Sequence, residues 1–267
     1  MIESNLPIQV LMALEITHQL NDHGRLYFRV LISEEEQRNF LRNDYFNETV
    51  FVYDARGKTP RLLFCGKIES VECEKEGQVL FADIWVMSYT IALDRGKRSR
   101  SFQNPSMTFE KVVRQVIDGL SARYRWNVRD RATNQAYFQY LESDWEFLVR
   151  LASRFNCPLQ VNCATNVSDF HFGVRRGREQ VLNEAEIVES GFSRDYYTNG
   201  GYVAGHDRGD YRYLKVRHLE FWEIGDFVQF QSQRFTVCGR VIRFEEGRLV
   251  FVDTAWRVGI ASSSNAL

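Results

Sequence analysis

The stretch YLESDWEFLVRLASRF, residues 140–155, carries the strongest local signal in the sequence. Ser143 and Glu146 have the spacing of a capping box, in which each side chain accepts a hydrogen bond from a backbone N–H at a helix start. The apolar residues that follow repeat at helical spacing on one face: Leu148, Leu151, Ala152 and Phe155. Pro158 then ends the pattern. The stretch predicts a capped amphipathic helix over residues 143–155, packed on a sheet, whose acidic residues serve capping rather than chemistry.

A second helix is predicted upstream, over residues 108–120. Thr108 is a good N-cap residue. The apolar stripe behind it is nearly unbroken: Phe109, Val112, Val113, Val116, Ile117 and Leu120. Such a stripe indicates core packing, and nothing in it suggests a cofactor site. The two helices therefore predict a helical layer in the middle of the chain.

The chain on both sides of these helices has the pattern of β-strands. Residues 7–32 alternate around a turn cluster at Asn21–Gly24, and Ser33 opens a short capped helix. Strand patterns continue to Thr90, and they return over the last part of the chain as short, closely spaced runs. An aromatic content of 14% also favours β structure.

These patterns divide the chain into four parts. Residues 1–95 are expected to form a first β-barrel domain. Residues 96–210 are expected to form a connector and insertion with the two helices and short strands, because the composition becomes polar and basic at 94–105 and turn-rich after 175. Residues 211–260 are expected to form a second β-barrel segment, and 261–267 a polar tail. The expected class is α+β, mainly β: two small related antiparallel barrels with a helix-containing insertion.

An internal repeat supports the idea of two related barrels. FCGKI at residues 64–68 resembles VCGRV at 237–241. Each is followed by a Glu-Gly turn and then by a similar run, LFAD at 80–83 and VFVD at 250–253. The connections differ by three residues, which a hairpin can absorb at its tip. The alternative is chance similarity between two hairpins.

Composition excludes several classes of protein. The 34 basic and 35 acidic residues give a net charge of −1, so the basic excess of a nucleic-acid binder is absent. A local basic run at residues 95–100 is more typical of a solvated loop. The five cysteines lack the C-x-x-C spacing of zinc and redox sites, which favours reduced, buried thiols. The sequence has no membrane span and no signal-peptide pattern, so we expect a protein made in the cytoplasm.

No catalytic motif stands out. The phosphate-binding glycine loops, the serine-hydrolase elbow and the zinc-binding helix motif are all missing. His206 and Asp207 are the least implausible acid–base or metal pair, but a solvated turn explains them better. Asp83 and Asp94 are candidates for a glycosidase pair, although nothing in the sequence brings them together. We therefore predict no enzyme activity, no catalytic, cofactor-binding or metal-binding residues, and no cofactor.

The helix stretch resembles the signature of the VgrG and phage late-control D family, the hub proteins of contractile tails and contractile injection systems. The matching residues are Glu142, Ser143, Asp144, Phe147, Leu148, Arg150, Leu151 and Ala152. Three further segments match in order: residues 64–68, residues 88–108 with their Leu-Asp and Ser-Phe-Gln motifs, and residues 225–228. Asn156 departs from the family, which often has Gly after the helix. The chain also ends before the spike region of full VgrG proteins, which implies a hub with a separate spike or a fragment.

The resemblance implies a structural role. Family hubs are homotrimers in which each subunit contributes two similar barrels, giving a pseudo-sixfold ring. Such a ring joins a hexameric inner tube to a trimeric spike and starts assembly of the tube and baseplate. The implied partners are a second and third copy of the chain, the inner tube protein, the spike protein and other baseplate proteins, in a phage tail or tail-like particle. The alternative function is a stand-alone β-barrel module that binds a sugar or peptide.

Overall fold

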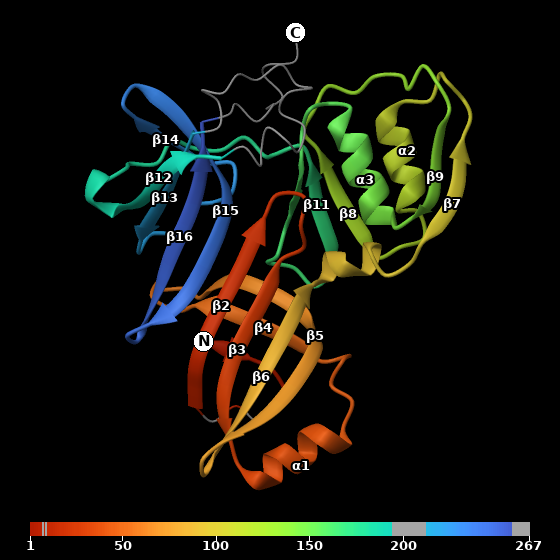
Figure 1. The fold of residues 1–267 in the computed structure, drawn as a ribbon. Coiled ribbons are helices and arrows are strands. Elements are labelled where there is room, and N and C mark those ends of the chain that lie inside the picture. The colour runs from red at the N-terminus through yellow and green to blue at the C-terminus, as the bar shows by residue number, and fades with distance from the viewer. Residues whose placement is uncertain (7, 9, 194–211, 258–267) are drawn as a thin grey trace.

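The computed structural model describes residues 1–257 except 7, 9 and 194–211. One large antiparallel sheet runs through the molecule, and a smaller body of helices and short strands packs against one end of its N-terminal half (Figure 1). The expected class, mainly β with a few helices, is confirmed.

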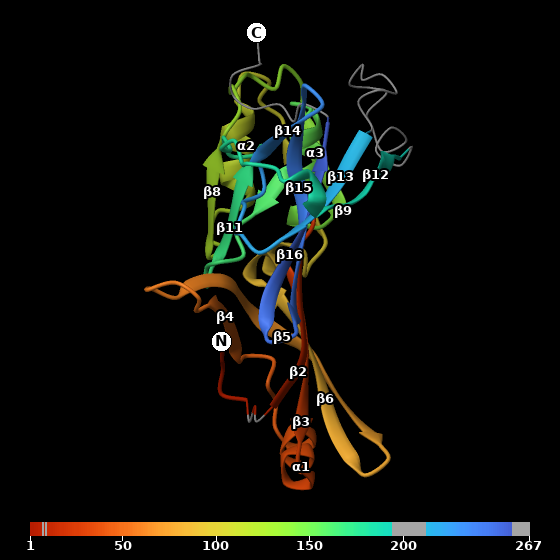
Figure 2. The ribbon, with the colours of Figure 1, turned by 90° about the vertical axis from the view of Figure 1, so that its left-hand side faces the viewer.

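The N-terminal half of the sheet contains six strands: β1 (Ile2–Glu3), β2 (Val10–Gln19), β3 (Arg25–Ile32), β4 (Thr49–Asp54), β5 (Arg61–Glu76) and β6 (Val79–Ser88). Helix α1 (Glu34–Arg42) follows β3, and Ser33 and Glu36 form its predicted capping box. Strands β5 and β6 make a long hairpin that projects beyond the rest of the sheet (Figure 2).

The C-terminal half contains five strands: β12 (Ile187–Phe192), β13 (Arg212–His218), β14 (Phe227–Phe230), β15 (Gln233–Glu245) and β16 (Arg248–Trp256). It has a buried cluster of its own, made by Leu214, Val216, Trp222, Ile224, Val228, Phe235, Val237 and Ala255. The C-terminal half therefore has an apolar cluster of its own, although its Ile242 and Phe251 belong to the larger cluster of the N-terminal half. The division of the chain into domains stays a prediction, and β12 pairs with this half of the sheet.

The two halves join through strands far apart in the sequence. Glu15–Gln19 of β2 pairs antiparallel with Gly239–Arg243 of β15. The resulting order is β1-β4-β5-β6-β3-β2-β15-β16-β13-β12, and β14 also pairs with β15. Within the described residues this order is an open path, so the hydrogen bonds there close no barrel.

The two halves share one strand topology. In the first, β2 pairs with β3, β3 with β6, β6 with β5, and β5 with β4. In the second, β12 pairs with β13, β13 with β16, β16 with β15, and β15 with β14. All these pairs are antiparallel and follow the same order along the chain. We call the two sets unit 1 (β2 to β6) and unit 2 (β12 to β16).

The sequence repeat lies on equivalent strands of the two units, but not at equivalent register positions. Gly66 on β5 stands opposite Ser88, which is near the far end of β6. Gly239 on β15 stands opposite Thr254, nearer the middle of its hairpin. The FCGKI and VCGRV motifs therefore identify the right strands, whereas the strand ladders place their residues a few positions apart.

The insertion contains two helices between short strands. They are β7 (Arg98–Phe102), α2 (Phe109–Val116), β8 (Ala122–Trp126), β9 (Tyr137–Glu142), α3 (Asp144–Ser153), β10 (Leu159–Val161) and β11 (Ser168–Phe172). Two 3-10 turns, Tyr89–Leu93 and Glu184–Glu186, lead into and out of it. Both helices confirm the sequence prediction, with Thr108 and Ser143 as their N-caps. Part of the expected connector is the strand β7, paired with β9, and β8 pairs parallel with β11.

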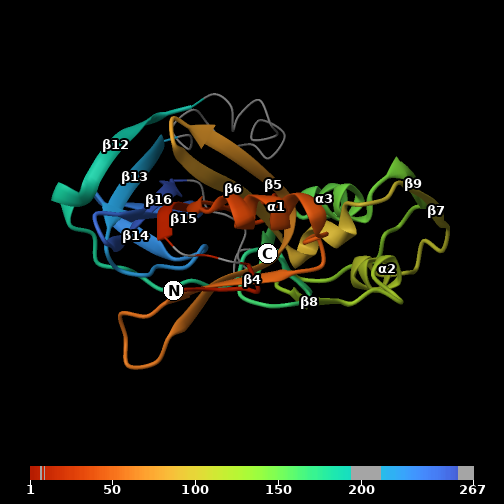
Figure 3. The same ribbon diagram turned by 90° about the horizontal axis from the view of Figure 1, so that it is seen from below.

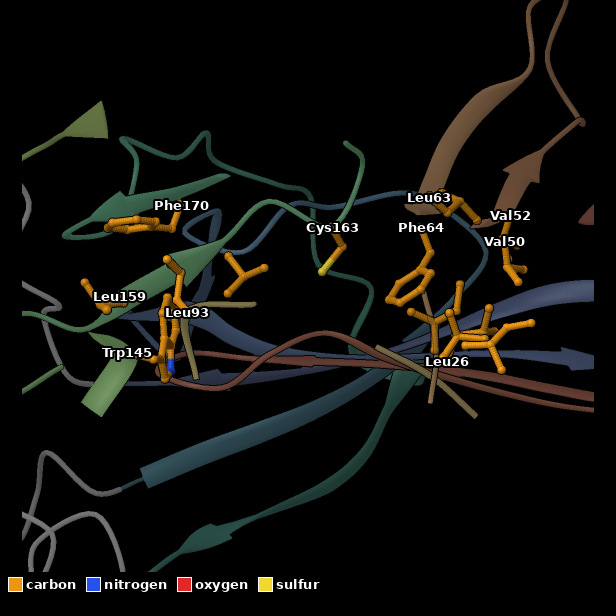
Figure 4. Close-up of a cluster of buried hydrophobic side chains, with 14 of the residues drawn as sticks. Leu26, Val50, Val52, Leu63, Phe64, Leu93, Trp145, Leu159, Cys163 and Phe170 are labelled. Atoms are coloured by element: carbon orange, nitrogen blue, oxygen red, sulfur yellow. The ribbon is translucent and has the colours of Figure 1, made fainter. Parts of the chain in front are cut away.

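A continuous apolar core ties the insertion to unit 1. Leu26 and Phe64 of the sheet pack at one end of this cluster, and Trp145 and Phe170 of the insertion pack at the other (Figure 4). Cys163 lies between them, and its carbonyl oxygen accepts a hydrogen bond of 2.7 Å from the Cys65 N–H. Viewed from below, the insertion extends away from unit 2 (Figure 3). Within the described residues, no helix is long and apolar enough to cross a membrane.

Candidate assembly site

The start of α3 is a buried polar cluster. The Ser143 Oγ accepts a hydrogen bond of 3.1 Å from the Glu146 N–H, and the Ser143 N–H donates to the Glu146 Oε2 at 2.7 Å. Ser143 is fully buried, and its hydroxyl donates to the Asp94 carboxylate. The capping box predicted from the sequence is therefore present, and it also binds the residue that follows the 3-10 turn.

Asp144 is 3% exposed and contacts polar side chains from two neighbouring strands, β7 and β9. The guanidinium of Arg100 donates to its Oδ1, and the Nε of Arg98 lies 3.3 Å from its Oδ2. The Gln139 amide, from β9, also donates to Oδ1 at 3.0 Å. A buried carboxylate is tolerated when it is paired and hydrogen-bonded in this way. Asp144 is thus a structural anchor for the β7–β9 pair.

The basic run at residues 95–100 is engaged in internal ion pairs. Lys97 Nζ lies 2.5 Å from Glu146 Oε2, and this hydrogen bond is the main cause that lowers the pKa of Glu146. Arg95 Nη2 lies 3.2 Å from Glu69 Oε2 on β5. With Arg98 and Arg100 on Asp144, each basic side chain of the run has a carboxylate partner. The expected solvated loop is found at residues 95–97, which are exposed, whereas Arg98–Arg100 belong to strand β7, where the expectation of a loop is wrong.

The remaining signature residues bind α3 to its surroundings. Arg150 makes a bidentate pair with Glu142, both N–O distances being 2.8 Å. The Trp145 Nε1–H donates to the Asn21 carbonyl oxygen at 3.1 Å, and the Trp145 ring packs against the His23 ring at a tilt of 40°, with centroids 4.7 Å apart. Asn21 and His23 lie in the β2–β3 turn, so α3 is joined to the sheet beside the β2 strand that connects the two halves.

The junction between the halves contains a buried charged group. Asp253 is fully buried, and Arg240 donates to it at 2.7 and 3.2 Å. His218 Nε2 lies 2.9 Å from the same carboxylate. His18, the register partner of Arg240, lies half-buried beside them, and its Nε2 atom is enclosed. Burial first, and then the nearby Arg240, lower the pKa of His18 to about 4, so it is neutral at pH 7.

The outer strand of unit 2, β12, carries exposed apolar side chains, and so does the start of β2 in unit 1, where Val10 is 47% and Met12 is 53% exposed. On β2, Leu14 is 5% and Ile16 is 2% exposed. On β12, Val188 is 57% and Phe192 is 77% exposed. In the part of the chain that the structure describes, β12 pairs only with β13. Exposed apolar side chains along an unpaired strand edge are a feature of association surfaces.

The structure brings no candidate catalytic pair together among the described residues. Asp83 accepts a hydrogen bond from the Tyr27 hydroxyl at 2.6 Å, whereas Asp94 binds Ser143 and lies 3.6 Å from His23. The two carboxylates have different partners. His206 and Asp207 lie outside the described residues. No group of three His, Cys, Asp or Glu side chains within the described ranges is placed to hold a metal ion.

All five cysteines are free thiols, as the sequence predicted. Burial raises the pKa of Cys157, Cys163 and Cys238 to about 12, which keeps these thiols protonated and unreactive. A polar pocket of about 250 Å³ is lined by Arg61, Arg175, Arg178, Gln180, Phe221, Glu223 and Asp226. Arg175 already pairs there with Glu223 and Asp226, at 2.6 and 2.7 Å. The charges of this pocket largely neutralise each other.

Comparison with known proteins gives a family match over part of the chain and a shared fold. Residues 36–155 match the model of the phage tail baseplate hub family. No curated protein sequence matches the chain. The matched region runs from α1 to just beyond the end of α3, and it therefore includes the Ser143 cap and the basic run paired to it.

Several solved structures share the fold at low sequence identity. One is the E. coli c3393 protein, described as a component of the type VI secretion system, with a TM-score of 0.69, 14% identity, and coverage of 96% of this chain and 76% of that chain. A 43 kDa prophage tail protein from Shewanella oneidensis has a TM-score of 0.70 and 10% identity, with 95% of each chain covered. A tail protein from Neisseria meningitidis has a TM-score of 0.69 and 9% identity, with 97% of each chain covered. The family match and the shared fold support the resemblance found in the sequence: residues 36–155 match the phage tail baseplate hub family, and the chain shares its fold with proteins described as phage tail and type VI secretion components.

Proposed function

We propose that the chain is the structural hub of a phage tail or contractile injection system. Three copies form a ring that joins a hexameric inner tube to a trimeric spike and starts assembly of the tube and baseplate. The hub is built into the particle after synthesis in the cytoplasm. Its partners are its own copies, the tube protein, the spike protein and other baseplate proteins, and it acts without catalysis.

The observation that carries this proposal is the repeated topology of units 1 and 2. Two similar units per chain give six similar units in a trimer. Such a ring can present sixfold-like contacts on one side while it stays threefold on the other. The similarity of the two units thus offers a physical route from a hexameric partner to a trimeric one. In this proposal each unit takes the place of one of the two related β-barrels.

In this proposal the polar cluster at the start of α3 has a mechanical role. It anchors the insertion to the β2–β3 turn through Trp145 and to β5 through the pair of Arg95 and Glu69. A load applied to the insertion is therefore transmitted to the strands that set the spacing of the two units. This role needs packing and ion pairs, and no reactive group.

The proposal is tested by measuring the mass of the purified protein in solution and its binding to the inner tube protein. Three chains of 31.4 kDa give about 94 kDa, and the trimer is expected to bind tube protein. A stable monomer with no affinity for tube protein would contradict it. A monomer that binds a sugar or a peptide would favour the alternative of a stand-alone binding module.

A further inference from the structure

The polar pocket of about 250 Å³ lies where three parts of the chain meet. Arg61 lines it from unit 1, at the start of β5. Residues 175–180 line it from the segment that leads from the insertion to unit 2 (Figure 1). Residues 221–226 line it from the loop between β13 and β14. A group bound in this pocket would therefore lie between the two units.

Both carboxylates of the pocket already have partners. Asp226 is 2% exposed, and its Oδ1 accepts hydrogen bonds from the Arg175 guanidinium at 2.7 Å and from the Arg178 N–H at 3.0 Å. Its Oδ2 accepts from the Gln180 amide at 2.6 Å and from the Glu223 N–H at 3.0 Å. The Glu223 carboxylate lies 2.6 Å from Arg175 Nη2. Arg175 therefore serves both carboxylates.

Two arginines of the pocket remain without a carboxylate. Within the described residues, neither Arg61 nor Arg178 forms an ion pair, and three arginines against two carboxylates leave one net positive charge. An arginine presents its N–H donors in a fixed fork that matches a carboxylate. The pocket therefore has unused donors for an oxyanion.

Both arginines are held in place by the surrounding structure. The guanidinium carbon of Arg61 lies 4.6 Å from the centroid of the Phe221 ring. The backbone of Arg178 is fixed on both sides, because its N–H donates to Asp226 and its carbonyl oxygen accepts from the Phe227 N–H at 2.9 Å. An anion entering the pocket thus meets donors that are already positioned, which lowers the entropic cost of binding.

The size and the surroundings of the pocket indicate which anion it accepts. Sites for small molecules typically measure about 300–1,000 Å³, so this pocket is small for a ligand of that kind and fits a single side chain. Val181 follows Gln180 and is 90% exposed, and Leu219 precedes Phe221 by two residues and is 46% exposed. Exposed apolar side chains next to a charged pocket are a feature of protein contact surfaces and favour a protein partner over a free anion.

We propose that this pocket binds an aspartate or glutamate side chain on the surface of a partner protein. The carboxylate of that side chain pairs with Arg61 and Arg178, and its apolar neighbours pack on Val181 and Leu219. All the groups that line the site belong to one chain, so the proposal does not depend on the ring. Because Arg61 belongs to unit 1 and the β13–β14 loop to unit 2, the bound carboxylate also links the two units.

Isothermal titration calorimetry with two capped peptides tests the pocket. One peptide carries several glutamates with leucine neighbours, and the other has glutamines in their place. At about 0.15 M ionic strength, which screens long-range charge attraction, the glutamate peptide is expected to bind. Arg61→Gln and Arg178→Gln are each expected to weaken its binding by about tenfold or more, because hydrogen bonds to a charged group are strong. The glutamine peptide should bind more weakly by a similar factor.

Arg123→Gln is the matched control, because Arg123 is an exposed arginine of the insertion that hydrogen-bonds to Thr165 at 3.1 Å. It should leave binding of the glutamate peptide unchanged, and circular dichroism checks that all variants are folded. An equal loss in Arg123→Gln, or equal binding of the glutamine peptide, would indicate general attraction and overturn the proposal. Binding of sodium phosphate without binding of the glutamate peptide would assign the pocket to a free anion instead. Absence of binding by both probes would also contradict the proposal.

Discussion

At the scale of single residues, Asp144 explains why an acidic residue belongs in the family signature. Its buried carboxylate pairs with Arg98 and Arg100 and accepts a hydrogen bond from Gln139. These structural contacts account for the acidic residue without a substrate. The sequence showed the helix cap, but it gave no means of pairing Asp144 with strand β7, because the partners are more than 40 residues away. The same long-range pairing explains why the basic run at residues 95–100 shows no strand pattern in the sequence.

Asp144→Asn should therefore destabilise the fold. Removing the charge leaves two guanidinium groups without their carboxylate, and hydrogen bonds to charged groups contribute about 1.5–3 kcal/mol. We expect a loss of about 2 kcal/mol in the free energy of unfolding, measured by urea denaturation. Glu34→Gln is the control, because its partner Arg38 is exposed, and it should change stability by less than about 0.5 kcal/mol. Equal effects of the two substitutions would contradict the anchoring role of Asp144.

His18 makes stability depend on pH. Its pKa is about 4 in the folded protein, below the ordinary histidine value of 6.5, so the unfolded chain takes up the proton first as pH falls. The contribution of neutral His18 is full above pH 6.5 and is lost progressively down to about pH 4. The expected loss from this group is about 3 kcal/mol over that range.

Denaturation curves at several pH values between 7 and 4 check this dependence. His18→Asn cannot take up a proton, so it should weaken the pH dependence of the free energy of unfolding, even if it lowers the value at pH 7. An unchanged slope in His18→Asn would show that other groups cause the acid sensitivity. Burial and Arg125 also lower the pKa of His171 to about 4, so His171 contributes to the acid sensitivity that remains in His18→Asn.

At the scale of elements, the helices were predictable because their signals are local. Capping boxes and apolar stripes lie within a few residues, and α1, α2 and α3 all begin at the predicted caps. Strand β7 was missed because its arginines look polar until Asp144 is placed beside them. Strand β12 was missed because Glu189 and Gly191 give it no strand pattern. Pairing between β2 and β15 depends on residues more than 200 positions apart, which no local pattern records.

Helix α3 offers a pair of substitutions that separates capping from packing. Glu146→Ala removes one side of the capping box and should lower stability by about 1 kcal/mol while leaving the fold and assembly intact. Leu151 is fully buried, so Leu151→Asp places an unpaired charge in the core and should abolish folding or assembly. Circular dichroism and solution mass distinguish the two. A folded Glu146→Ala protein that lost a measurable reaction would contradict the structural role of this helix.

At the scale of the whole molecule, the internal repeat connects the fold to the proposed function. The sequence motifs identified strands β5 and β15 as related, and the structure extends that relation to five strands in each unit. The sequence predicts two barrels, whereas the described residues form two similar units of one open sheet.

Electron microscopy of the purified protein tests the central claim most directly. Three chains with two similar units each should give rings with a central hole, threefold symmetry, and six lobes of similar size in end-on class averages. Isolated monomers, or particles with only twofold symmetry, would contradict the hub.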